Sequence, residues 1–89
     1  MVRAMAEADE PSDEAVRGRI SKDIALFQKN IDVQGAAIKD VRLAKIAELS
    51  KMYASDATSY LQKDDLYTAF SCISYAHGLL DAVLELNRG

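Results

Sequence analysis

Apolar residues recur along this chain at intervals of three and four positions, which is the period of one face of an α-helix. The first stripe consists of Val16, Ile20, Ile24, Phe27 and Ile31. Ser12 stands just before it, followed by Asp13 and Glu14, and this order is typical of a helix start. The pattern predicts a first helix over about 13–31.

The second apolar stripe is the longest. It consists of Ile38, Val41, Ile46, Leu49, Tyr53, Ala57, Tyr60 and Leu61. The stripe predicts a helix over about 36–62, preceded by a break at Gly35, where we expect a left-handed backbone conformation. Because further apolar residues widen this stripe, we expect the second helix to contact two neighbours and to be central.

The third apolar stripe follows a short polar break. It consists of Ala69, Ile73, Ala76, Leu80, Val83 and Asn87. The stripe predicts a third helix over about 65–87. The break, Lys63-Asp64-Asp65, predicts a tight turn in which Asp64 tolerates a left-handed conformation and an aspartate caps the third helix.

Two short connections between three helices predict antiparallel neighbours. We therefore expect an all-α protein, an up-down-up antiparallel three-helix bundle. Residues 12–89 would form the single domain, and residues 1–11 would form a frayed or disordered acidic leader. Gly18, within the first helix, is expected to mark the close approach of a neighbour.

Composition narrows the classes of function. The net charge of −3 disfavours non-specific binding to nucleic acid, and no apolar run reaches the ~20 residues of a membrane span. The single Cys72 excludes an internal disulfide and favours a reducing compartment, so we expect a cytoplasmic protein. The sequence holds no phosphate-binding glycine loop, metal-ligand spacing or nucleophile motif. We therefore expect no catalysis, no cofactor and no metal.

The run Tyr75-Ala76-His77-Gly78-Leu79-Leu80-Asp81-Ala82, with the acidic turn before it, resembles a signature of small archaeal proteins known as domain of unknown function family 357. The resemblance covers mainly residues 47–84. It implies a three-helix bundle with a left-handed twist, like the immunoglobulin- and albumin-binding domains, and it implies no activity. Family members carry Lys-Gly-Asp at the turn, where this chain has Asp64 in place of the glycine.

His77 and Asp81 are one helical turn apart and share a helix face. Antiparallel pairing about the turn places Asp81 beside Lys45. One interpretation is structural, with a His77–Asp81 hydrogen bond and an Asp81–Lys45 ion pair between two helices. The other is a small cleft over Gly78, walled by His77 and Asp81, that binds a ligand. Gly78 itself favours close packing of a neighbour, since a glycine within a helix costs about 1 kcal/mol.

All four tyrosines, Tyr53, Tyr60, Tyr67 and Tyr75, belong to the last two predicted helices. They could pack along the seam between these helices, with Tyr60 and Tyr67 meeting across the turn. They could equally form a patch that binds a partner, because tyrosine is enriched at interfaces. Cys72 is expected to be a small boundary residue whose pKa nothing lowers.

The basic stripe Lys39, Arg42 and Lys45 is expected to be a solvated face. Two functions remain open. The first is a protein-interaction or self-association module that uses the face of the second and third helices. The alternative is an accessory domain that binds a small anion, nucleotide or metal near His77, Gly78 and Asp81. The partner's identity cannot be read from the sequence.

Overall fold

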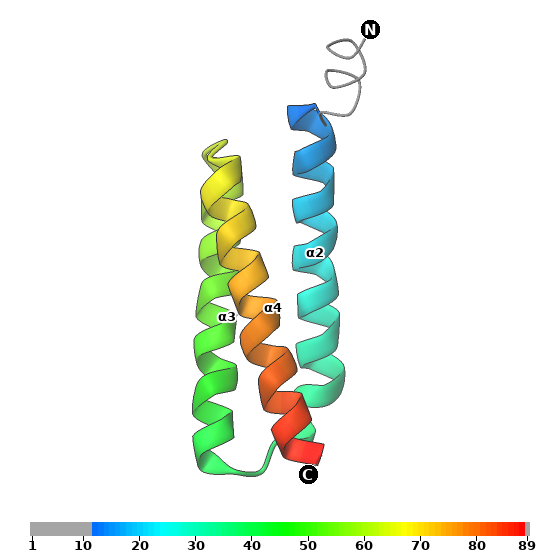
Figure 1. Cartoon of the computed structure of the whole chain (residues 1–89), viewed down its shortest axis with the longest axis vertical. Coiled ribbons are helices and arrows are strands. Elements are labelled where there is room, and N and C mark those ends of the chain that lie inside the picture. Colours follow the sequence, from blue (N-terminus) through cyan, green and yellow to red (C-terminus); the bar gives the residue numbers. More distant parts are fainter. Residues whose placement is uncertain (1–11, 89) are drawn as a thin grey trace, which may run out of the picture.

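The computed structural model describes residues 12–88 and consists, over that part, of three long α-helices and one short 3-10 turn (Figure 1). The helices are α2 (Asp13–Gln34), α3 (Val41–Gln62) and α4 (Leu66–Arg88), and the 3-10 turn is η1 (Gly35–Ala37). Helices α2 and α4 run in one direction and α3 runs in the other. The expected all-α three-helix bundle is confirmed. The expected leader, residues 1–11, lies outside the described residues.

Each helix starts at a side chain that accepts a hydrogen bond from the backbone of the first turn. The Ser12 hydroxyl accepts from the Ala15 amide at 3.1 Å, and the Asp65 carboxylate accepts from the Thr68 amide at 3.2 Å. Asp40 accepts from the amides of Arg42 and Leu43. These bonds satisfy donors that a helix start leaves without a partner.

The Asp40 cap explains why α3 begins at Val41, five residues later than the apolar stripe predicts. Ile38 is in an extended conformation, which separates η1 from α3. Gly35 has a φ of −62°, in the right-handed region, so the predicted left-handed conformation at Gly35 is wrong. Helix α2 instead continues to Gln34 and tightens into η1.

The turn between α3 and α4 has the predicted form. Asp64 has a φ of 65°, in the left-handed region that few residues other than glycine adopt. The Asp65 amide donates to the Tyr60 carbonyl at 2.9 Å, which closes the end of α3. Helix α4 then runs back along α3.

Helix α4, and not α3, is the central helix of the bundle, so that prediction is wrong. It packs along most of α3 and also contacts α2, whereas α2 and α3 touch each other least. The size of the residues that each helix buries explains why α4 is central. Helix α4 buries Ala69, Ile73, Ala76, Leu80 and Val83. Helix α3 buries only small residues, Ala47, Ser50, Ala54 and Ala57.

Small residues on α3 allow α4 to approach closely, while the large side chains of the core come from the other two helices. Phe27 and Ile20 of α2 and Ile73 and Leu80 of α4 are all almost completely buried. Several larger residues of the predicted α3 stripe are left at the surface as a result. Leu49, for example, is 40% exposed.

Candidate functional site

His77 points from α4 to α2. Its Nε2 atom lies 2.8 Å from the backbone carbonyl oxygen of Asp23, and its ring meets the Phe27 ring edge-on, with the ring centres 5.7 Å apart. Because a carbonyl oxygen only accepts, Nε2 carries the hydrogen of this bond. Among the described residues His77 forms no hydrogen bond with Asp81, contrary to the structural interpretation. His77 joins two helices that are distant in sequence.

The other residues of the predicted His77 site lie apart. Asp81 is exposed and lines a depression of about 280 Å³ with Leu84, Glu85, Arg88 and Gln34, between the last turns of α2 and α4. Lys45 is exposed on α3, and among the described residues it forms no ion pair with Asp81, contrary to prediction.

Gly78 is also at the surface. A Cβ atom added to it would have no heavy atom within 4 Å apart from its chain neighbours and the backbone of its own helix, and the same holds for Gly18. The predicted close approach of a neighbour is wrong at both glycines. The structure thus does not bring His77, Gly78, Asp81 and Lys45 together into one cleft.

A groove that the sequence did not reveal separates α2 from α3 on the side away from α4. Its volume is about 440 Å³, and apolar side chains including Ile24, Phe27 and Ala54 line it. Polar side chains also line it, from Gln28, Asp32, Lys51, Ser55, Thr58 and Ser59. The polar residues beside each apolar stripe are the one sequence feature that bears on this groove. Periodicity shows which residues share a helix face, but it does not show that two helices stand apart.

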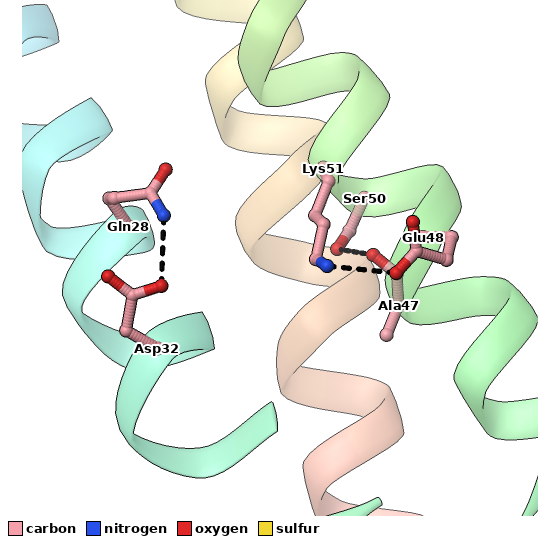
Figure 2. A network of polar contacts seen from close by, with 6 residues as sticks. All are labelled: Gln28, Asp32, Ala47, Glu48, Ser50 and Lys51. Atoms are coloured by element: carbon pink, nitrogen blue, oxygen red, sulfur yellow. Dashed lines mark hydrogen bonds and ion pairs between the residues drawn. The ribbon is translucent and has the colours of Figure 1, made fainter. Parts of the chain in front are cut away.

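The polar groups beside this groove bond within their own helix. Figure 2 shows Gln28 and Asp32 on α2, joined at 3.1 Å, and Lys51 and Glu48 on α3, joined at 2.8 Å. The buried Ser50 hydroxyl donates to the Ala47 carbonyl at 2.6 Å, also within α3. No hydrogen bond drawn there crosses from α2 to α3. The polar contacts therefore stabilise each helix and do not close the groove.

Two of the four tyrosines meet across the α3–α4 seam. The rings of Tyr53 and Tyr75 pack edge to face with their centres 4.6 Å apart, and Tyr75 remains 52% exposed. Tyr60 is half-buried, with the Lys63 ammonium 5.5 Å from its ring centre. Tyr67 is 83% exposed, and the expected packing of Tyr60 against Tyr67 is not found in the described part of the chain.

The tyrosine pair belongs to a larger exposed apolar surface, which we call the tyrosine face and define as Leu49, Met52, Tyr53, Cys72 and Tyr75. Tyr53, Cys72 and Tyr75 line one shallow depression. Leu49 and Met52 lie on the same side of α3 by helical spacing, and Met52 is 63% exposed. The α3 residues that line the groove are different ones, so the two surfaces lie on different sides of α3.

Cys72 is a half-buried free thiol. Burial raises the pKa of the Cys72 thiol above 9.0, and the nearby charges of Asp56 and Asp65 raise it further. A thiol of this kind is mostly protonated at neutral pH and is a weak nucleophile. No charge nearby lowers the pKa, as the sequence predicted.

Arg17 ties the start of α2 to the α3–α4 turn, a contact that the sequence analysis missed. Its Nη1 atom donates to the Leu61 carbonyl at 3.1 Å, and its Nη2 atom forms an ion pair with the Asp64 carboxylate. Sequence offers no signal for this contact, because 47 residues separate the two charges. Asp64 thus combines an unusual backbone conformation with a partner on another helix.

Residues 12–88 hold neither a metal-ligand cluster nor a membrane-spanning helix. No group of three or more His, Cys, Asp or Glu side chains is arranged to hold a metal ion. None of the helices in this part of the chain is long and apolar enough to cross a membrane.

Comparison with known proteins identifies a family. The model of a family described as "Protein of unknown function (DUF357)" matches residues 23–88, which include all of α3 and α4 and most of α2. Neither a curated protein nor a solved structure matches the chain. The match begins at Asp23, whose carbonyl accepts the His77 hydrogen bond, so both partners of that contact lie within it. This chain is a member of the DUF357 family, as its resemblance to that family predicted.

Proposed function

We propose that this protein is an interaction module without catalytic activity, which binds another protein chain through the tyrosine face. The observation that carries the proposal is the exposure of large apolar side chains on that surface, with Met52 63% and Tyr75 52% exposed. Tyrosine and methionine are enriched where protein interfaces are most deeply buried. The Tyr53–Tyr75 pair is held across two helices, so a partner would meet a preformed surface.

Only part of this surface serves the core: Tyr53 and Cys72 pack against it while partly buried, whereas Leu49, Met52 and Tyr75 are left exposed. The buried residues of α3 and α4 include no member of the tyrosine face. Clustered apolar side chains that the fold leaves exposed mark a contact site more often than scattered ones do.

The alternative function, an accessory domain that binds a small anion, nucleotide or metal near His77, Gly78 and Asp81, has less support. The His77 Nε2 atom is already engaged by the Asp23 carbonyl, and Asp81 lines a depression with other residues. We propose the cytoplasm as the location, in keeping with the one free thiol, since disulfides are rare in reducing compartments.

Site-specific photocrosslinking in the source cells tests the proposal. A benzophenone amino acid replaces Met52 in the tyrosine face. The matched control replaces Leu26, an apolar residue of α2 that is 50% exposed and lies on a different helix. Both positions are exposed and apolar, so neither replacement should disturb folding, which circular dichroism checks.

We expect a crosslinked protein product from position 52 and none from position 26. Absence of a product at position 52, or equal yields at both positions, would contradict the proposal. The mass of the product shows whether the partner is a second copy or a different protein.

A further inference from the structure

Four exposed residues of α3 form one stripe with opposite charges at its ends. They are Lys45, Leu49, Met52 and Asp56, at spacings of 4, 3 and 4, so they share one face of the helix. A base stands at the start, an acid stands at the end, and two apolar side chains lie between them. The spacing is the same from either end of the stripe. Reversing the direction of the helix therefore puts Asp56 in the place of Lys45 and Met52 in the place of Leu49.

The charges at the two ends have no ionic partner among the described residues. Lys45 and Asp56 belong to none of the ion pairs there, although Glu48 and Lys51, on the groove side of the same helix, pair with each other. The stripe therefore presents one unpaired positive charge, an apolar centre and one unpaired negative charge to whatever covers it.

We infer that a second copy of this chain covers the stripe, with the two α3 helices antiparallel about a two-fold axis midway between Leu49 and Met52. This inference rests on the proposed function and names its partner. In this arrangement Lys45 of each copy faces Asp56 of the other. Within one helix Lys45 and Asp56 are about 16 Å apart, at 1.5 Å per residue, so the two ion pairs lie at opposite ends of the contact. Leu49 of each copy meets Met52 of the other, as an isologous contact requires.

The charge pattern selects this orientation. If the two helices ran in parallel and in register, Lys45 would face Lys45 and Asp56 would face Asp56, and both contacts would be repulsive. Only the antiparallel arrangement pairs both charges while keeping the apolar centre covered. Tyr53 and Tyr75 flank the stripe on the side of α4 and extend the apolar contact.

A contact built on one helix face is small, so the dimer belongs to the weak and transient class of interfaces. Its ion pairs lie at the rim, where salt screens them. Association should therefore depend on protein concentration and weaken as salt is added.

Charge reversal tests the arrangement. Sedimentation equilibrium at low salt compares the wild-type chain, Lys45→Glu, Asp56→Lys, an equal mixture of these two variants, and the double variant. Both side chains are exposed and form no ion pair within residues 12–88, so each variant should fold, which thermal unfolding verifies separately.

We expect the wild type to dimerise and each single reversal to weaken dimerisation by about tenfold or more, because each creates two like-charge contacts. The mixture should dimerise again, because Glu at position 45 of one variant then faces Lys at position 56 of the other. The double variant should dimerise with itself and not with the wild type.

A wild-type chain that stays monomeric at all concentrations overturns the inference, and so does a mixture that fails to recover. These results are independent of the crosslinking at Met52. A crosslink to a different protein would uphold the proposed function while removing the second copy as the occupant.

Discussion

His77 holds α2 against α4 through one hydrogen bond and one ring contact. Replacing it with alanine removes the bond to the Asp23 carbonyl and the edge of the Phe27 contact. We expect His77→Ala to lower the free energy of unfolding by about 1–2 kcal/mol, since each interaction contributes about 0.5–1.5 kcal/mol. Urea unfolding followed by circular dichroism measures the change.

Two further variants separate the contributions. His77→Phe keeps a ring beside Phe27 but cannot donate to the Asp23 carbonyl. The decrease in its free energy of unfolding therefore reports mainly the hydrogen bond. Asp81→Ala should change stability by less than about 0.5 kcal/mol, because Asp81 is exposed and takes no part in the His77 contacts. A cost for Asp81→Ala equal to that of His77→Ala would point back to a His77–Asp81 pair.

Asp64 combines a left-handed backbone with an ion pair to Arg17. In Asp64→Ala the unfavourable backbone conformation remains and the ion pair is lost, so we expect a loss of about 1 kcal/mol or more. Asp64→Gly relieves the conformation while losing the same pair. These effects oppose each other, and the stability of the glycine variant should stay within about 0.5 kcal/mol of wild type.

Thermal and urea unfolding of the two Asp64 variants, with Arg17→Ala as a third, measures this balance. If alanine and glycine at position 64 gave equal stability, the left-handed conformation would not be the cause. The family resemblance, which implies a glycine at this turn, makes the comparison informative for this chain.

At the scale of elements, Asp40 sets the start of α3 and gives the fold a dependence on pH. Hydrogen bonds from the Leu43 and Arg42 amides, together with the Arg42 charge, hold the pKa of the Asp40 carboxyl below its ordinary value of 3.8. A carboxylate with a depressed pKa in the folded state stabilises the fold above the unfolded-state pKa. The stabilisation is lost as the pH falls from about 3.8 through the lower folded-state value.

Asp40→Asn provides the test, because asparagine caps a helix well but does not titrate. We expect the difference in melting temperature between wild type and Asp40→Asn to be constant near neutral pH and to shift against the wild type below about pH 4. Melting curves at a series of pH values measure it. A difference that does not change with pH would show that Asp40 does not accept these bonds.

The three helices and the turn at Asp64 follow from apolar spacing and local capping, which are properties of neighbouring residues. The start of α3 was misplaced because apolar spacing continues through Ile38, while the Asp40 carboxylate decides where the helix begins. Spacing also shows which residues share a face but not which helix that face meets. The apolar stripe of α3 is wide, but the residues that α3 buries are small. The larger buried residues belong to α4, which is the central helix.

At the scale of the whole molecule, the contacts between α2 and the hairpin of α3 and α4 could not be predicted from the sequence. Residue spacing could describe only the antiparallel hairpin of α3 and α4, so it paired His77 with Asp81 and gave no partner on α2 for His77. Its partner is a backbone carbonyl, 54 residues away, which carries no residue-specific signal. The candidate tyrosines were predicted as a set, but only the structure shows that Tyr53 and Tyr75 are the two that meet.

The direction of the helices has a consequence for the electric polarity of the whole molecule. Helices α2 and α4 begin at the same end of the bundle, where α3 finishes (Figure 1). Since each helix carries partial positive charge at its start, two helices against one leave a net macrodipole along the bundle. Charged side chains lie at both ends of the bundle. The end where α2 and α4 begin carries four acidic residues, Asp13, Glu14, Asp64 and Asp65, beside three basic ones, Arg17, Arg19 and Lys63. The other end carries four basic residues, Lys39, Arg42, Lys45 and Arg88, beside three acidic ones, Asp32, Asp40 and Glu85.

Charged side chains at each end therefore largely cancel one another, and only a small excess of charge opposes the backbone polarity. Because the effect of a helix dipole falls off within about one turn and is screened by salt, the molecule exerts little long-range torque on an approaching chain. The orientation of any bound partner is then decided after contact, by short-range pairs such as those at the ends of the α3 stripe.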